Sequence, residues 1–208
     1  AMNEQKPTGR IKVAEIGGSL SSYGDHHGEA SAMGTCVKLA TKYDNNVPIF
    51  EGHGSFGSRM VPEAASPRYI FVSLFPEFKK YFVDEEVCDN SPSDDHPEPV
   101  SYLPTIPWLL VNGASGIAVG FKCNVLPRSV DDLKAAVKAC VKNETKFLND
   151  DKIILPSFPS FKGTVKHVEG RKYTTTGIVT YEGKYTYKIS ELPIGYDRAA
   201  YVEHLHSM

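Results

Sequence analysis

Apolar residues recur at α-helical spacing in two parts of the chain. Between residues 30 and 43, and again after Ser129, they fall at i, i+3, i+4 and i+7, the pattern of a helix with one buried face. Ser129 and Asp132 form a start for the second helix that resembles a capping box. The predicted inward positions are Met33, Cys36, Val37 and Ala40 in the first helix, and Leu133, Ala136, Val137, Cys140 and Val141 in the second.

Short apolar or alternating segments predict β-strands, most of them in the last third of the chain. Residues 48–50 and 69–74 are strand candidates in the first third, although 69–74 is also compatible with a helix start. In residues 184–190, apolar side chains alternate with lysine and threonine, which gives one apolar and one polar face. The later strands are expected at 152–155, 162–168, 172–181 and 184–190, with Glu169-Gly170 and Glu182-Gly183 as hairpin turns.

The remaining segments favour irregular structure or short helices. Residues 1–16 are expected to be irregular or partly helical and to end at Gly17-Gly18, and the aromatic stretch 75–82 favours a helix. Residues 84–99 contain prolines and many acidic residues with no Lys or Arg, which is typical of a solvated loop. Residues 112–120 predict a glycine-rich turn that runs into a short apolar segment. A last helix should begin at Asp197.

The composition is that of an ordinary globular protein, and it does not point to nucleic acid. The 208 residues are 41% hydrophobic and 23% charged, with a net charge of −2. A pI near 6.4 counts against a DNA-binding protein. The charge is uneven, however: lysines and arginines between residues 162 and 188 far outnumber Glu169 and Glu182, so a basic surface is compatible with the total.

Two classes of protein fit the sequence poorly. No apolar run approaches the roughly 20 residues of a membrane span, and no signal segment opens the chain. The four cysteines lie far apart without a C-x-x-C pair, which argues against a zinc ribbon and favours reduced thiols in a cytosolic protein.

The pair Arg68-Tyr69 is the first candidate for chemistry. Alone it carries little information, because a tyrosine on a strand is usually a packing residue. A phenol has a pKa of about 10, so it becomes a nucleophile only when its anion is stabilised or its proton is taken. Arg68 would stabilise that charge and clamp phosphate oxygens. Both side chains reach one phosphate only if the backbone turns there, which the preceding Pro67 makes plausible.

Two upstream segments contain the other candidates. Glycines between residues 52 and 58 would let the backbone approach a phosphate while Arg59 adds charge, although an ordinary turn explains them equally well. His26 and His27 would supply a proton or a positive charge, with a capping or surface role as the alternative. A metal site at this histidine turn is disfavoured because its candidate ligands are too local. Ile117 is either a wedge between DNA bases or, taken without its context, a core residue.

Five motifs in the same order resemble type IIA DNA topoisomerases of the eukaryotic and T-even-like phage kind. In that family a Tyr-His-His-Gly-Glu turn starts the recognition helix of a winged-helix domain, and Asp25 stands here where the family has the tyrosine. The matching segments are His26-His27-Gly28-Glu29, Gly54-Ser55-Phe56-Gly57-Ser58-Arg59, Ala64-Ala65-Ser66-Pro67-Arg68-Tyr69-Ile70, Ile106-Pro107-Trp108-Leu109-Leu110-Val111-Asn112-Gly113 and Gly116-Ile117-Ala118-Val119-Gly120.

The resemblance implies an α+β fold, with a partial winged-helix domain followed by a β-rich tower or shoulder domain. The implied boundaries are 1–83 for the winged helix with the catalytic tyrosine, 84–99 for the acidic loop and 100–200 for the tower. Residues 201–208 would begin a truncated helix that leads toward a coiled coil.

The resemblance also implies roles for single residues. Tyr69 would form a 5′-phosphotyrosyl bond with DNA, Arg68 would stabilise the transition state, and His27 would contact the scissile phosphate. The further DNA contacts implied are His26, Gly57, Ser58, Arg59 and the intercalating Ile117.

The family also implies what lies outside the chain. Mg²⁺ would be held by a TOPRIM partner and ATP by a partner ATPase, with no metal site in this chain. The expected assembly is a homodimer within a hetero-oligomer that acts on double-stranded DNA, without a membrane, in the cytoplasm (that of the host, for a phage protein). The implied function is the DNA cleavage and religation part of an ATP-dependent type II DNA topoisomerase, inactive without its TOPRIM and ATPase partner. The alternatives are a non-catalytic DNA-binding fragment and a structural subunit of the DNA gate.

Overall fold

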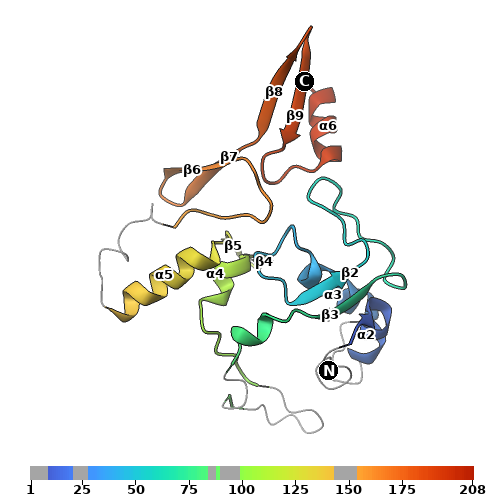
Figure 1. Cartoon of the computed structure of the whole chain (residues 1–208), viewed down its shortest axis with the longest axis vertical. Coiled ribbons are helices and arrows are strands. Elements are labelled where there is room, and N and C mark those ends of the chain that lie inside the picture. Colours follow the sequence, from blue (N-terminus) through green and yellow to red (C-terminus); the bar gives the residue numbers. More distant parts are fainter. Residues whose placement is uncertain (1–8, 21–27, 84–87, 90–98, 143–153) are drawn as a thin grey trace. The chain divides into compact units, whose positions relative to one another are not determined.

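The chain folds into two compact units. The first is built from residues 1–58 and 63–108, and the second from residues 59–62 and 109–208. The backbone therefore enters the second unit briefly before it returns to the first. The computed structural model describes residues 9–20, 28–83, 88–89, 99–142 and 154–208 (Figure 1). The predicted acidic loop lies mostly outside the described residues, and the boundaries predicted at 83 and 99 stay predictions.

The first unit combines helices with a small antiparallel sheet. Its described strands lie in the order β1-β3-β2, and Gly52 of β2 pairs with Val72 of β3. This arrangement agrees with the predicted α+β fold that begins with a partial winged helix. The elements are β1 (Ile11–Lys12), α2 (Val13–Leu20), α3 (Glu29–Ala40), β2 (Phe50–His53), β3 (Phe71–Leu74) and a short 3-10 helix, η2 (Phe78–Lys80).

Helix α3 confirms the predicted apolar face. Cys36 and Ala40 are buried, and Met33 and Val37 pack against the same core. Burial raises the pKa of the Cys36 thiol to about 12, since the thiolate is poorly solvated there. This core also contains Val13, Ile16, Phe56, Ile70 and Val72.

The expectation that the N-terminal segment ends at Gly17-Gly18 is wrong. Helix α2 runs straight through both glycines to Leu20. A Cβ on Gly17 would lie 2.7 Å from Cγ of Met33, so the glycine allows α2 to approach α3 closely. The glycine therefore marks helix packing and not a helix end.

The second unit is rich in β-hairpins, as predicted. In each of three pairs, consecutive strands are antiparallel: β4 with β5, β6 with β7, and β8 with β9. The elements that follow η2 are α4 (Trp108–Asn112), β4 (Ala114–Ala118), β5 (Phe121–Val125), α5 (Val130–Val141), β6 (Thr164–Glu169), β7 (Lys172–Thr176), β8 (Ile178–Gly183), β9 (Thr186–Glu191) and α6 (Arg198–His206).

Several predicted strand limits need correction. The predicted strand 172–181 is two strands that are separated at Gly177, and residues 154–155 of the predicted strand 152–155 are not in a strand. The last turn lies at Lys184-Tyr185, two residues beyond its predicted place, with φ of 45° and 67°. Two consecutive positive φ values match the twist of a two-residue hairpin turn. The segment 112–120, predicted as a glycine-rich turn that runs into a short apolar segment, forms strand β4 followed by a turn at 119–120.

The buried face of α5 differs from the prediction at its C-terminal end. Leu133 is buried, and Ala136 and Val137 are half-buried, as expected. Ala139 is buried, however, whereas Cys140 and Val141 are exposed. The helix is amphipathic as predicted, but in its last turn Ala139 faces the core in place of Cys140 and Val141.

This correction predicts a difference between two truncations in α5. Leu133→Ala should lower the free energy of unfolding by about 2–5 kcal/mol because it leaves a cavity at a site with 1% exposure. Val141→Ala, at 79% exposure, should change it by less than about 0.5 kcal/mol. Urea denaturation of the two variants measures both values. Equal losses would contradict the observed helix face.

Candidate functional site

The candidate nucleophile Tyr69 ends a four-residue turn. Ser66, Pro67 and Arg68 precede it, and the Tyr69 amide donates to the Ser66 carbonyl at 2.9 Å. Serine at the first position and proline at the second suit such a turn, because proline fixes φ near the required value. Strand β3 begins only at Phe71. The backbone turn required for Arg68 and Tyr69 to share one target is therefore present.

The turn is held against the first turn of α2. The amides of Val13 and Ala14 donate to the carbonyls of Ile70 and Pro67, at 3.1 Å and 3.3 Å. Amides at a helix start lack partners within the helix, so these bonds satisfy donors of α2 while they fix the turn. Ile70 itself is 1% exposed. The residue after Tyr69 is thus anchored in the core.

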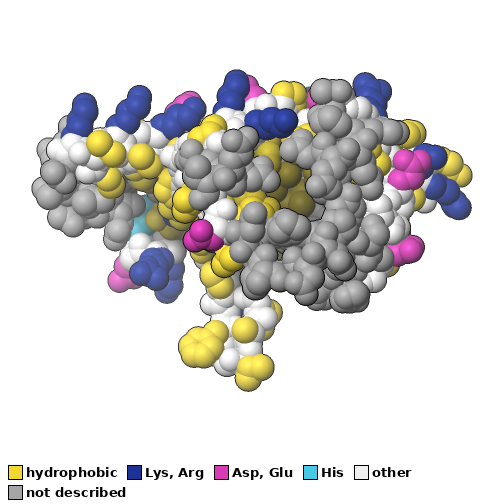
Figure 2. All heavy atoms as spheres, turned by 90° about the horizontal axis from the view of Figure 1, so that it is seen from below, with side chains coloured by type: hydrophobic (Ala, Val, Ile, Leu, Met, Phe, Trp, Pro, Cys, Tyr) yellow, Lys and Arg dark blue, Asp and Glu magenta, His cyan; other side chains and the backbone are white. Residues whose placement is uncertain are grey.

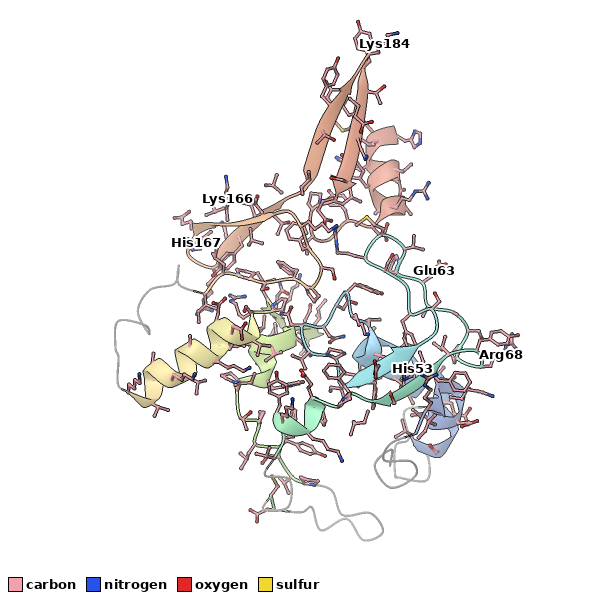
Figure 3. The ribbon with its side chains drawn as sticks, in the orientation of Figure 1. His53, Glu63, Arg68, Lys166, His167 and Lys184 are labelled. Carbon is pink, nitrogen blue, oxygen red and sulfur yellow. The ribbon has the colours of Figure 1, made fainter. Side chains whose placement is uncertain are left out.

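Both reactive side chains point outward from this anchored turn. Tyr69 is 68% exposed, although it is a large aromatic residue. The Arg68 guanidinium carbon lies 5.2 Å from the centre of the Tyr69 ring. Figure 3 shows Arg68 directed away from the sheet of the first unit. The guanidinium of Arg68 and the phenol of Tyr69 therefore lie side by side and are both accessible to a ligand.

The glycine-rich loop, residues 52–58, is joined by a hydrogen bond to the segment just before the turn at Ser66–Tyr69. Phe56 is buried in the core of the first unit, and the Ser55 carbonyl accepts a hydrogen bond from the amide of Ala65 at 2.9 Å. The predicted DNA contacts Gly57 and Ser58 are exposed. The two predicted histidines, His26 and His27, lie outside the described residues, so the structure does not place them.

A different histidine lies at the start of the glycine-rich loop. His53 of β2 is hydrogen-bonded through Nε2 to Oγ of Ser73 on β3, at 2.8 Å, and Figure 3 shows it within the sheet. No pattern in the sequence indicated a role for this histidine. The alternation of the strand pair could have indicated the contact once the register was known.

Arg59 lies in the segment of the second unit that interrupts the first. Its guanidinium forms an ion pair with Glu191 and lies over the ring of Phe161, 5.5 Å from the ring centre. Burial lowers the pKa of Arg59. The predicted contact of Arg59 with DNA stays a prediction, and these observed partners suggest another role.

Ile117 lies on the exposed hairpin of β4 and β5. It is 84% exposed, and its neighbours Val119 and Phe121 are 99% and 81% exposed. Taken without its context, Ile117 was expected to be a core residue, and its exposure contradicts that alternative. Figure 2 shows a narrow projection whose end is covered by hydrophobic side chains. Such apolar residues at a hairpin end are unusual on a water-facing surface and suit insertion into another molecule.

The hairpin of β6 and β7 presents one basic and polar face. Lys166 pairs in register with Thr174, and both are exposed. On the other face His167 and Tyr173 are half-buried, and Nε2 of His167 donates to the Gly170 carbonyl at 2.7 Å. Of the basic residues between 162 and 188, Lys166 is exposed on β6, whereas Lys184 lies in the turn between β8 and β9, away from Lys166 (Figure 3). One continuous basic surface across this stretch stays a prediction.

Two further findings concern metals and membranes. Within the part of the chain that the structure describes, no three His, Cys, Asp or Glu side chains gather to hold a metal ion. Among these same residues, none of the helices has the length and hydropathy needed to cross a bilayer.

Comparisons with known proteins agree with the resemblance to type II DNA topoisomerases. The family model that describes the A subunits of DNA gyrase and topoisomerase IV matches residues 1–208. The DNA topoisomerase medium subunit of Enterobacteria phage T4 is 37% identical over 193 residues, which is 92% of this chain and 42% of that protein. Human DNA topoisomerase 2-alpha is 34% identical over 202 residues, covering 88% of this chain and 12% of that protein.

A solved structure resembles the fold along nearly the whole chain. It is the DNA-binding, cleavage and re-ligation domain of Plasmodium falciparum topoisomerase II, with a TM-score of 0.86 and 27% identity. The match covers 98% of this chain and 28% of that one. The chain thus spans less than half the length of each of these relatives.

The packing of the loop against Ile70 predicts opposite effects for two glycine substitutions. Gly54 has φ of +114°, and a Cβ there would lie 2.9 Å from Cγ2 of Ile70. Gly54→Ala should therefore lower the free energy of unfolding by more than about 1 kcal/mol. Gly34, in α3, has open space around it, so Gly34→Ala should stabilise by up to about 1 kcal/mol. Thermal unfolding of both variants tests this, and a harmless Gly54→Ala would contradict the packing described.

Proposed function

This chain belongs to the family of DNA gyrase and topoisomerase IV A subunits, and we propose that it supplies the DNA cleavage and religation part of an ATP-dependent type II DNA topoisomerase. The observation that supports this most strongly is the exposed Tyr69 beside Arg68, on a turn anchored by Ile70 and α2. A packing tyrosine would be buried, whereas Tyr69 lies on a hydrogen-bonded turn and its side chain is accessible.

In the proposed reaction the Tyr69 oxygen attacks a DNA phosphorus atom. A bond forms between that oxygen and phosphorus as the bond to the 3′ oxygen of the neighbouring nucleotide breaks, which leaves a 5′-phosphotyrosyl link and a free 3′ hydroxyl. The phenol loses its proton and the departing oxygen gains one. Because one phosphodiester replaces another, the 3′ hydroxyl can later attack the same phosphorus and restore the strand.

Arg68 would stabilise the charge that develops on the phosphate during both steps. Its guanidinium is exposed and close to the Tyr69 ring, so its fork of donors can reach nonbridging oxygens. We assign His27 to the scissile phosphate as a proton donor or positive charge, with His26 beside it, from the family resemblance alone.

The proposed contacts with the DNA duplex come from both units. Gly57 and Ser58 would approach the backbone beside the cleaved bond, and Ile117 would enter a base step and bend the duplex. The exposure of all three residues supports these roles. Lys166 and its basic neighbours on β6 and β7 would contact phosphates further along.

The complete reaction requires partners. We propose that a TOPRIM region on a partner holds Mg²⁺ and that a partner ATPase binds ATP, in a hetero-oligomer that contains two copies of this chain. We further propose that the assembly acts in the cytoplasm, that of the host cell if a phage encodes it.

The proposal predicts a covalent adduct that depends on Tyr69. The complete enzyme is mixed with end-labelled duplex DNA and Mg²⁺, and the reaction is stopped with denaturant. Wild type should retain protein on the 5′ ends, and Tyr69→Phe should retain none. An adduct that survives in the phenylalanine variant would contradict the assignment. Salt-sensitive DNA binding without any adduct would indicate a DNA-binding fragment. Absence of both the adduct and DNA binding would indicate a structural subunit.

A second prediction separates the shape of Arg68 from its charge. Arg68→Ala should lower the rate of adduct formation by roughly 10²- to 10³-fold, as for the loss of a transition-state donor. Arg68→Lys keeps the charge but loses the planar fork, so its loss should be smaller but clear. Lys80→Ala, at an exposed ion pair with Glu77, is the control and should react at the wild-type rate. Single-turnover kinetics distinguish the variants, and unchanged rates in both Arg68 variants would contradict the role.

A further inference from the structure

We infer that Arg59 is a positioning residue that fastens the segment leading to Tyr69 to the end of β9 through Glu191, and that it is not a contact to DNA phosphate. This inference rests on the proposed function of Tyr69. It assigns a role to Glu191, which no sequence pattern singled out, and it replaces the role that the family resemblance implied for Arg59.

The first support is the burial of the pair. The side chain of Glu191 is 7% exposed and that of Arg59 is 17% exposed. Removing one member of such a pair leaves the other charge buried without compensation, which is far more costly than losing an exposed pair. An arginine that binds DNA phosphate would instead be expected to have an exposed side chain, as Arg68 has.

The second support is that both ends of the pair are engaged by protein groups. Nη1 of Arg59 donates to the Pro193 carbonyl at 3.4 Å, and its guanidinium stacks on Phe161. The second carboxylate oxygen of Glu191 accepts a hydrogen bond from the amide of Lys162 at 3.0 Å. One carboxylate therefore joins the segment 59–62, the residues before β6 and the end of β9.

The third support is a second tie next to Arg59. The carbonyl of Met60 accepts a hydrogen bond from the amide of Arg198, at the start of α6, at 3.1 Å. Residues 59–62 belong to the second unit and are tied to other parts of it through Arg59 and Met60, while residues 63–108 belong to the first unit. The chain reaches Tyr69 only a few residues after this excursion ends. Its path toward the nucleophile therefore starts from a segment that β9 and α6 hold in place.

This arrangement has a consequence for catalysis. If the segment is released from Glu191, the approach of the chain to the turn at Ser66–Tyr69 loses one of its fixed points. Misplacing a reacting group by about 1 Å can cost on the order of 10²-fold in rate. DNA affinity, in contrast, should be nearly unaffected, since neither Arg59 nor Glu191 touches the DNA in this arrangement.

The test compares Glu191→Gln, Arg59→Lys and the double variant in the complete enzyme. Glutamine is nearly isosteric with glutamate, so folding should survive, and thermal unfolding checks this. Each single variant should lower the rate of adduct formation at saturating DNA by roughly 10- to 100-fold, and the double variant should be no worse than the worse single one. The exchange variant Arg59→Glu with Glu191→Arg should recover part of the rate. Glu182→Gln, in the exposed pair with Lys188, is the matched control and should behave as wild type.

The salt dependence of DNA binding decides between the two roles of Arg59. The slope of log K against log salt should be the same in wild type, Arg59→Met and Glu191→Gln. If Arg59 contacts a phosphate, Arg59→Met should reduce the slope by about 0.9, and Glu191→Gln should leave adduct formation intact. That result, or additive losses in the double variant, would overturn the inference. Absence of adduct in wild type would instead refute the proposed function.

Discussion

The position of Tyr69 depends on the burial of Ile70. A nucleophile must be exposed to reach a phosphate, yet an exposed aromatic on a free loop would sample many positions. In this structure the two requirements are met by adjacent residues: Tyr69 is exposed and Ile70 is buried. Ile70 is inserted in the core and its carbonyl is bonded to α2, while the turn at Pro67 directs Tyr69 outward. The core of the first unit therefore anchors the backbone beside the reactive group.

Two arginines that are close in the sequence differ in role because their surroundings differ. Arg68 and Arg59 are similar in charge and lie on the same segment of the sequence. Arg68 is exposed and lies over the ring of the tyrosine beside it, whereas Arg59 is enclosed by Glu191, Phe161 and a carbonyl. The first is placed to act on a ligand and the second to hold the protein together, and nothing in their residue type distinguishes them.

The sequence predicted features that depend on local patterns. Apolar periodicity predicted the helix at α3, a last helix was expected from Asp197, and Pro67 favoured a backbone turn before Tyr69; all three are present. Features that depend on distant contacts were missed. Gly17 suggested a helix end but is required by the approach of Met33, and the partner of Arg59 lies far along the chain at Glu191.

The exact turns of the hairpins were also not predictable from local sequence patterns. Gly170 and Gly183 located the last two hairpins approximately, but the turns themselves lie at Gly170-Arg171 and Lys184-Tyr185. Register depends on which side chains face the rest of the protein, and the hairpin of β8 and β9 is exposed on both faces along most of its length. Without a buried face, the alternation of tyrosine and lysine does not fix the register.

The covalent bond between Tyr69 and DNA is the central claim, and locating that bond tests it most directly. Cleavage by the complete enzyme is trapped with denaturant, the DNA is trimmed with nuclease, and the protein is digested for mass spectrometry. We expect a nucleotide phosphate on the peptide that contains Tyr69, with fragment ions that place it on this phenol. A nucleotide on another tyrosine, or on a serine of the same turn, would contradict it.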